Sequence, residues 1–449
     1  MGKNSGINDV LLLDNYGEES RMLHQAFKAS GFQGKVVVIE DSGFLPEDVL
    51  SVYRYFCGNF KGEKGIPGKA RYFNQINIPD YWEIEATNSS GKIMNLYQQR
   101  GSIFYTAPAH KRLVSFVDWM DEHGVVRSTD HYDQYGALYA RTTFSKKGQR
   151  FCKSYYTAQN REVIVENFVT GDIILNRDGK VHLFRNKVQL LKYFFEAAGI
   201  SYDSIYYNSL STPFFLSESL SSTEKNDILF WQENVRNDIP GNMQIILQGR
   251  ASRTRQIFVQ KKDSYEKLIE LGAPTDIVKP LGFVYDYESE NHGGRDVLIC
   301  TNSDQIEQLE YLVSHMPQMT IHIAAITEMS SKLLAMAKYE NVCLYPGVKT
   351  RVLEELFKKC DLYLDINHAN EIVSSVKTAF LNNQLILGFE NTLHNRNYVA
   401  EKHIFTNVDD MLKVIDEVMQ DRKSLKRHLK LQQKHAMAEG TDDYKKIFE

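Results

Sequence analysis

The chain has 449 residues, with 53 Lys and Arg against 57 Asp and Glu, so its formal net charge is −4. That balance excludes a nucleic-acid binder driven by global charge, and the length suits two or three structural units. Aromatic residues make up 12% and proline only 10 residues, which argues against extensive disorder.

The first 75 residues alternate between strands and helices. The pattern predicts a strand at 9–13, a helix near 18–30, a strand at 35–40 and another helix after Pro46. The second strand is apolar on both faces, as a buried parallel strand requires. We assign residues 1–75 to an N-terminal Rossmann-like lobe.

The hydrophobic period changes to two between about residues 81 and 184. Gly124, Gly136 and Gly148 recur every 12 residues and each closes a polar turn between strand-length segments. The spacing predicts strands at 125–132, 137–144 and 150–156. We therefore expect an antiparallel β-meander over residues 76–185, inserted in the N-terminal lobe.

The α/β pattern resumes at 186–275 and completes the N-terminal lobe, with a helix predicted at 188–198 and strands at 228–231 and 256–259. A polar, turn-rich stretch at 275–295 predicts a domain boundary. A second Rossmann-like lobe is expected over 276–420, and a C-terminal helix over 421–449. The C-terminal lobe is predicted to contain strands at 296–300, 319–324, 361–366 and 385–389, alternating with helices at 304–314, 328–337, 349–358 and 371–382.

This organisation resembles the retaining glycosyltransferases of the two-lobed GT-B class that carry an inserted meander. The implied fold is α/β and GT-B-like, with two Rossmann-like lobes facing a cleft and ligands at the carboxyl ends of the strands. In that class a Lys and an Arg after the first C-lobe strand bind the pyrophosphate of the sugar donor. Here no Lys or Arg occurs from Asp296 to Ser331, so a pyrophosphate would meet a field of the wrong sign.

The second signature of the class is a pair of glutamates eight positions apart, before a strand that ends in Gly-Phe. Anchored on Gly388 and Phe389, the two positions fall on Asn370 and Thr378. A glycine-rich turn is also replaced, by Ala324 and its neighbours. The resemblance therefore implies no catalytic residues in this chain, because its donor site is degenerate.

Four segments carry a closer resemblance: Tyr16–Gly31, Ile39–Pro46, Val163–Leu175 and Pro240–Met243. Together with the degenerate C-terminal lobe, they resemble the GtfB-type accessory subunits of two-component O-GlcNAc transferases. Those enzymes modify serine-rich repeat adhesins before export by the accessory Sec system of Gram-positive bacteria. The resemblance implies a non-catalytic subunit that stabilises a GtfA-like glycosyltransferase in a heterotetramer and binds the unfolded serine-rich repeat polypeptide. UDP-GlcNAc would bind the partner, and no cofactor or metal is expected in this chain.

Aromatic residues of the meander are the first candidates for contact with a partner or acceptor, although about half of them should be core. Three arginines, Arg250, Arg253 and Arg255, follow the Pro240 helix in a loop expected to face the inter-lobe cleft. A solvated surface cluster is the more ordinary interpretation of these arginines. The candidate contact residues are Trp82, Tyr97, Trp119, Tyr132, Tyr139, Tyr155, Tyr156, Asn242, Arg250 and Arg253.

The five cysteines are widely spaced and form no Cys-x-x-Cys pair, which favours a reducing cytoplasm. The opening apolar run, Val10 to Leu13, is too short for a signal-peptide core. The basic stretch from Arg422 to Lys434 suits anionic lipid headgroups on the cytoplasmic face of the membrane. We favour the alternative that this helix packs on the N-terminal lobe with its lysines in water.

The sequence leaves two other functions open to comparison. The chain could be an active retaining GT-B glycosyltransferase with a rearranged donor site, acting on a protein or a cell-wall polymer. Glu371 and Arg250 would then be essential. An extracellular lectin is disfavoured by the unpaired cysteines and by the lack of a recognisable export signal.

Overall fold

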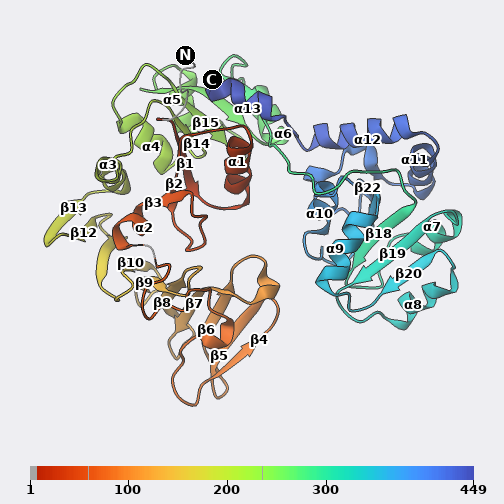
Figure 1. Cartoon of the computed structure of the whole chain (residues 1–449), viewed down its shortest axis with the longest axis horizontal. Helices are drawn as coiled ribbons and strands as arrows, with labels where there is room; N and C mark the ends of the chain where they lie inside the picture. Colours follow the sequence, from red (N-terminus) through yellow and green to blue (C-terminus); the bar gives the residue numbers. More distant parts are fainter. Residues whose placement is uncertain (1–7, 59, 235, 449) are drawn as a thin grey trace. The chain divides into compact units, whose positions relative to one another are not determined.

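The computed structural model describes residues 8–58, 60–234 and 236–448. The chain forms two compact units. The first unit contains the chain up to Pro280 together with the segment from Tyr444 onward, and the second unit runs from Leu281 to Asp443. The predicted α/β class is confirmed: each unit has a parallel sheet, and a ten-stranded antiparallel sheet belongs to the first (Figure 1).

The parallel sheet of the first unit has seven strands in the order β17-β16-β15-β14-β1-β2-β3. Its strands are β1 (Val10–Asn15), β2 (Lys35–Glu40), β3 (Val49–Ser51), β14 (Ile205–Tyr207), β15 (Asp227–Trp231), β16 (Thr254–Val259) and β17 (Val278–Pro280). Its helices are α1 (Glu18–Ala29), α2 (Val52–Cys57), α3 (Lys187–Ala197), α4 (Thr212–Ser219), α5 (Gly241–Leu247) and α6 (Lys262–Glu270).

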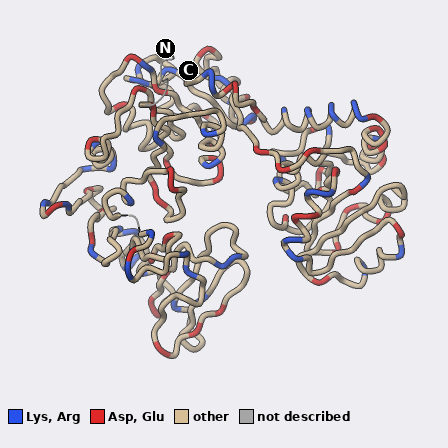
Figure 2. Tube along the Cα trace, in the orientation of Figure 1, with Lys and Arg blue, Asp and Glu red and all other residues tan. Residues whose placement is uncertain are grey.

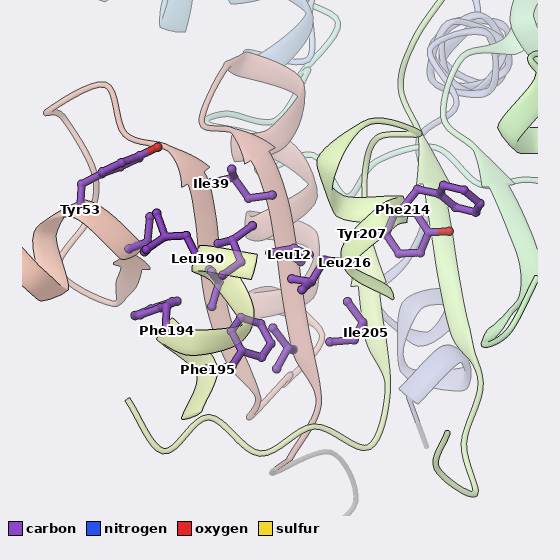
Figure 3. Packing of buried hydrophobic residues seen from close by; sticks show 14 of the residues in the cluster. Leu12, Ile39, Tyr53, Leu190, Phe194, Phe195, Ile205, Tyr207, Phe214 and Leu216 are labelled. Atoms are coloured by element: carbon purple, nitrogen blue, oxygen red, sulfur yellow. The ribbon is translucent and has the colours of Figure 1, made fainter. Parts of the chain in front are cut away.

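The core of the first unit forms because β1 and β2 are apolar on both faces. Leu12 and Ile39 are fully buried, in one cluster with Leu190 and Phe195 of α3 (Figure 3). Helix α3 starts at a fixed place, because the side chain of Asn186 accepts a hydrogen bond from the backbone N–H of Gln189.

The ten strands of the antiparallel sheet pair in sequence order from β4 to β13, so the predicted meander is confirmed. The predicted turn glycines Gly124, Gly136 and Gly148 all have positive φ, between 73° and 84°. The strands are β4 (Glu83–Ala86), β5 (Ser90–Asn95), β6 (Gln98–Tyr105), β7 (Val114–Met120), β8 (Val126–Tyr132), β9 (Leu138–Phe144), β10 (Arg150–Tyr156), β11 (Glu162–Asn167), β12 (Ile173–Arg177) and β13 (Lys180–Phe184).

Buried aromatic side chains join the meander to the rest of the first unit. Tyr155 of β10 stacks on Tyr53 of α2, with ring centres 4.0 Å apart. Tyr139 of β9 donates a hydrogen bond to the carbonyl oxygen of Asp41, 3.0 Å away. Gly43 follows at φ +81°, where a Cβ would lie 2.8 Å from the Tyr132 carbonyl oxygen, so no larger residue fits.

The second unit has a six-stranded parallel sheet in the order β20-β19-β18-β21-β22-β23. The strands are β18 (Asp296–Thr301), β19 (Thr320–Ala325), β20 (Val342–Tyr345), β21 (Leu362–Asp365), β22 (Leu385–Phe389) and β23 (Ile404–Phe405). The helices of this unit include α7 (Leu309–His315), α8 (Ser331–Leu334), α9 (Thr350–Lys359), α10 (Ser375–Leu381), α11 (Val408–Gln420) and α12 (Arg422–His435). Helix α10 begins later than predicted, because Val373 and Ser374 have φ of +45° and +51°, outside the helical region.

The C-terminal segment differs from the prediction of one helix that packs on the N-terminal lobe. It forms α12 and α13 (Thr441–Phe448). Helix α12 packs within the second unit, where the Gln432 side chain donates to the Gln384 carbonyl oxygen and accepts from the Ile386 N–H. Helix α13 belongs to the first unit from Tyr444 onward, and there Tyr444 and Phe448 contact Phe27.

Among the residues that the structure describes, no helix has the length and hydrophobicity needed to span a membrane.

Candidate functional site

A groove of about 480 Å³ opens on one face of the meander. It is bordered by Glu40 at the end of β2 and by Lys187 at the start of α3, so it lies at the carboxyl edge of the parallel sheet in the first unit. This edge is where open α/β sheets bind ligands. The groove is otherwise lined by Phe116, Asp118, Thr129, His131, Thr142, Phe144, Arg150, Lys153, Glu166 and Phe168.

Five of the lining residues form one polar row across neighbouring strands. Direct cross-strand pairing runs from Asp118 of β7 to Thr129, Thr142, Lys153 and finally Glu166 of β11. Because side chains of a strand alternate between faces, a polar residue at one position in each strand produces a continuous line. Strands about 4.8 Å apart give this row a length of roughly 19 Å, which matches about six residues of an extended peptide.

The Asp118 end of the groove consists of uncharged hydrogen-bonding groups and one bonded carboxylate. Thr129 donates from its hydroxyl to the Asp118 carboxylate. The Nε2 atom of His131 lies 2.9 Å from the Thr142 hydroxyl. Burial, together with the charge of Lys153, lowers the pKa of His131 to about 3, so this imidazole is neutral at physiological pH.

The two carboxylates at the α3 end of the groove are held by the protein itself. Glu166 is buried, and it accepts a short hydrogen bond from the Tyr53 hydroxyl. The Lys187 ammonium forms a short contact with Glu40 and lies 3.6 Å from Glu166. Burial alone would lower the pKa of Lys187, but the Glu166 and Glu40 carboxylates outweigh it and raise that pKa.

An aromatic strip lies beside the polar row on the same face. Phe104 and Phe116 stack with ring centres 4.5 Å apart, and His131 follows 6.2 Å beyond Phe116. At the other end, the Arg150 guanidinium lies 5.0 Å from the centre of the Phe168 ring. The groove therefore offers rings for flat or apolar groups and hydroxyl groups for polar ones.

None of the ten candidate contact residues predicted from the sequence is among the residues that line this groove. Tyr132, Tyr139 and Tyr155 are buried, and the latter two join the meander to the rest of the first unit, so they are not free to bind a peptide. Arg253 is 2% exposed and forms two hydrogen bonds with the buried Asp227. It holds the first unit together and does not face a ligand, which corrects its assignment.

The other aromatic candidates are divided between the far end of the meander and its turns. Trp82 and Trp119 pack against a second apolar cluster, and the Trp119 indole donates to Asp130. Tyr97 is 98% exposed at the turn after β5, and Tyr156 is half-buried at the end of β10.

The remaining polar candidates lie on and after α5. Asn242 donates to the Leu210 carbonyl oxygen, and Arg250 is exposed beyond the end of the helix. Arg255 hydrogen-bonds backbone carbonyl groups nearby. The three arginines thus do not form one cationic surface, because Arg253 is buried.

The polar row has no aromatic member, so the aromatic pattern of the meander does not mark it. A usable signal was present. Lys153 stands in the middle of a predicted strand and Glu166 in the meander segment Val163–Leu175, where a charged side chain on an otherwise apolar or hydroxyl-bearing face is unusual. Strand pairing then shows that they are direct neighbours.

At the carboxyl edge of the second sheet the polar side chains bond one another. His394 Nδ1 lies 2.5 Å from Asp365, and this hydrogen bond raises the pKa of the imidazole to about 9. His394 Nε2 lies 2.6 Å from the Ala369 carbonyl oxygen. Glu371 accepts a hydrogen bond from the Val376 N–H at the start of α10.

Both positions where a GT-B enzyme would carry its glutamate pair are occupied by uncharged residues. Asn370 is exposed, and the Thr378 hydroxyl donates back to the Ser374 carbonyl oxygen. Nearby, Glu307 pairs with His368 at 2.6 Å. Within the described parts of the chain, no group of three His, Cys, Asp or Glu side chains is arranged to hold a metal ion.

The chain combines two Rossmann-like units with a meander inserted in the first. In the second unit, the polar side chains at the strand edge bond one another, and the described residues there show no recognisable set of cations for the pyrophosphate of a sugar donor. These features define a glycosyltransferase-like protein. The particular family follows from comparison with known proteins: the chain belongs to the GtfB family. Its residues match the GtfB N-terminal domain (10–56), the GtfB middle domain (82–185), the GtfB third domain (187–271) and the GftB/GlyA-F C-terminal domain (297–432).

Individual relatives match over nearly the whole chain. The UDP-N-acetylglucosamine–peptide N-acetylglucosaminyltransferase stabilizing protein GtfB of Streptococcus agalactiae is 43% identical over 400 residues, covering 89% of both chains. Its counterpart in Streptococcus gordonii is 39% identical over 432 residues, covering 95% of both. A chain in the crystal structure of a GtfA/B complex bound to UDP and GlcNAc is 38% identical, with a TM-score of 0.90 and 98% coverage of each chain.

Proposed function

We propose that this chain is the non-catalytic, stabilising and acceptor-binding subunit of a peptide O-GlcNAc transferase complex. Its catalytic partner would be a GtfA-like glycosyltransferase, assembled with it as a heterotetramer. The complex would attach the first GlcNAc to Ser and Thr residues of serine-rich repeat adhesins before their export by the accessory Sec system. The groove on the meander is the observation that carries the acceptor-binding part of this proposal.

An unfolded Ser/Thr-rich polypeptide needs a surface that binds many similar segments without reading a strict sequence. The groove supplies it through the hydroxyls of Thr129 and Thr142, a neutral His131 and the Asp118 carboxylate. Each can exchange hydrogen bonds with a peptide group or a seryl hydroxyl. A row of roughly 19 Å engages several residues at once, so individually weak contacts add.

The sugar donor is assigned to the partner, and no cofactor or metal is assigned to this chain. A pyrophosphate develops negative charge as the glycosidic bond breaks and needs cations or free helix N-termini. At the corresponding edge here, Asp365 neutralises His394 and the Glu371 carboxylate already bonds the α10 N-terminus. The relatives named as stabilizing proteins support the same division of labour.

The decisive test measures transfer from UDP-GlcNAc to a Ser/Thr-rich peptide with each subunit alone and with both together. We expect no hydrolysis and no transfer by this chain alone, binding of the peptide by this chain, and increased transfer by the partner when this chain is present. Turnover by this chain alone, abolished by Glu371→Gln, would instead establish the active, rearranged glycosyltransferase.

We also propose that the complex works in the cytoplasm and touches the membrane through α12. This helix repeats Lys and Arg along its length (Figure 2). Its apolar residues Leu425 and Leu429 are buried in the second unit, so contact with anionic lipid would be electrostatic and would not involve insertion. The exposed cations of α12 are Arg422, Lys423, Lys426, Arg427, Lys430 and Lys434.

Co-sedimentation with phosphatidylglycerol and phosphatidylcholine vesicles tests this contact. The chain should bind only the anionic vesicles and should be released by about 0.5 M salt, because the interaction is screened. Lys426→Glu with Lys430→Glu should abolish binding, and Lys146→Glu with Lys147→Glu, in an exposed meander turn, should reduce it far less. Equal binding by both double variants would refute a role for α12.

A further inference from the structure

Two cations of the groove stand apart from the other charged groups because no carboxylate of the described chain neutralises them. Glu40 and Glu166 share Lys187, and Asp118 accepts from Thr129. In contrast, neither Arg150 nor Lys153 forms an ion pair or a side-chain hydrogen bond among the described residues; each has an aromatic ring as its close partner instead.

A β-bulge brings both cations to the same face of β10. Lys153 pairs with Thr142 and Glu166 in the polar row. Arg150 lies three positions earlier, so simple alternation would send it to the opposite face. The register shifts between Arg150 and Cys152, which pairs Arg150 with Phe144 and returns its side chain to the groove. Bulges commonly re-aim a side chain toward a functional site.

The environment of Lys153 makes an incoming negative charge favourable. Its ammonium lies 4.9 Å from the centre of the Tyr155 ring, and burial lowers the pKa of Lys153 despite the more distant carboxylates of Glu40 and Glu166. A partly buried cation without a hydrogen-bonded anion has lost hydration that a ring contact replaces only in part. A carboxylate placed against it would restore that stabilisation and add a charge-assisted hydrogen bond.

We propose that Arg150 and Lys153 receive a carboxylate side chain of the acceptor, so that the groove prefers Ser/Thr-rich segments that contain Asp or Glu. This inference rests on the proposed acceptor-binding function. It names the class of segment that binds best and the two residues that select it. Glycosylation would then start at Ser and Thr residues within a few positions of an acidic residue.

A peptide carboxylate fits the groove better than a phosphate does. The same walls carry the Asp118, Glu40 and Glu166 carboxylates, which would repel a dianion more strongly than a single negative charge. A carboxylate on an extended chain can also reach Lys153 while neighbouring residues bond Thr129 and Thr142. A peptide with acidic side chains but no Ser or Thr neighbours would not use the hydroxyl groups of Thr129 and Thr142.

The test compares three Ser/Thr-rich peptides of equal length that carry Glu, Gln or Lys at the same two positions. Binding is measured to the full chain and to its complex with the catalytic partner. The Glu peptide should bind about tenfold more tightly than the Gln peptide, as one charge-assisted hydrogen bond implies, and the Lys peptide should bind most weakly. Lys153→Met and Arg150→Met should each reduce the Glu preference, and Lys153→Arg should keep it.

Lys92→Met is the matched control. Lys92 belongs to the same row and face, two strands beyond Asp118, but does not line the groove. It should keep the full Glu preference. Thermal unfolding shows whether each variant is folded, and the comparison of peptides on the unmodified chain does not depend on any variant.

The outcomes separate this inference from the function on which it rests. Equal binding of the Glu and Gln peptides by the unmodified chain would overturn the carboxylate preference and leave acceptor binding intact. A Glu preference unchanged in both Lys153→Met and Arg150→Met would overturn the assignment to these residues. Failure of all three peptides to bind would overturn the acceptor-binding function, and the inference with it.

Discussion

The groove of the meander and the strand edge of the second unit both contain clusters of polar side chains, but these side chains differ in whether the protein itself supplies their partners. At the edge of the second sheet, Asp365 bonds His394 and Glu371 bonds a backbone N–H. In the groove, Arg150 and Lys153 have no anionic partner within the described residues. Polar groups that are satisfied internally stabilise the fold, and those that are not can bind a ligand.

This difference in internal bonding separates two regions that look alike in the sequence. Each has acids, histidines and hydroxyl groups in its strands or next to them. Only the pairing shows that the polar groups at the edge of the second sheet bond one another, while two cations of the meander contact aromatic rings instead. Substitutions in the two regions should therefore separate polar groups that stabilise the fold from those that are available for binding.

The largest expected effect is on a residue that the sequence suggested as a contact and the structure places in the core. Arg253→Met should lower the free energy of unfolding of the first unit by about 3–5 kcal/mol, because it leaves Asp227 buried and unpaired. Urea unfolding followed by tryptophan fluorescence measures it, because Trp82, Trp119 and Trp231 all lie in the first unit. The matched control, exposed Arg250→Met, should change that free energy by less than about 0.5 kcal/mol. Similar small effects of both substitutions would contradict a structural role for Arg253.

The next effect tests the internal bonding of the second unit. The Asp365 hydrogen bond raises the pKa of His394 above its ordinary value of 6.5 to about 9. The pair therefore stabilises the fold fully below about pH 6.5, and that contribution, up to about 3 kcal/mol, is lost as the pH rises through about 9.

Hydrogen exchange of peptides from β21 and β22, corrected for intrinsic rates, measures this loss. Protection should fall from pH 6.5 to 9.5 in the unmodified chain and should depend much less on pH in His394→Asn. An NMR titration of the His394 ring should give an apparent pKa near 9. A value near 6.5 would mean that the pair is not formed.

The sequence predicted the α/β class and the meander because strong local patterns carry them. The run Val36–Ile39 reads as a buried strand, and glycines spaced by 12 residues mark the hairpins. Elements of two to four residues, such as β3, β20 and β23, have too few positions to show a period and were missed. The missed helix α4 is apolar on most sides and thus lacks a helical stripe.

The site was harder to predict than the fold because it depends on pairing between strands. Aromatic content pointed to Tyr139 and Tyr155, which are core residues. Nothing local to Arg150 shows that a bulge turns it toward Lys153, since that requires the register of β9 and β10. The degenerate positions Asn370 and Thr378, in contrast, could be located from the sequence, because their spacing to Gly388 is local.

A smaller effect is expected from one hydroxyl of the polar row. Thr142→Val should weaken binding of a neutral Ser/Thr-rich peptide about fivefold, the loss of one hydrogen bond of about 1 kcal/mol, and should destabilise the first unit by a similar amount because His131 loses its partner. Thr143→Val is the control, since its hydroxyl contacts Cys152 on the opposite face. Isothermal titration calorimetry measures the peptide affinity of both variants. Equal weakening by the two variants would place the peptide elsewhere.

The smallest effect should come from Tyr97→Ala, although Tyr97 is the most exposed aromatic residue among those proposed as contacts, at 98%. It lies in the turn between β5 and β6 and outside the groove, so neither the free energy of unfolding nor peptide affinity should change by more than about 0.5 kcal/mol. Phe116→Ala is its counterpart inside the groove, where loss of the ring that stacks on Phe104 should weaken peptide binding several-fold. A strong loss of affinity in Tyr97→Ala with none in Phe116→Ala would move the acceptor site from the groove to the exposed turn. The unpartnered cations of β10 would then need a different ligand.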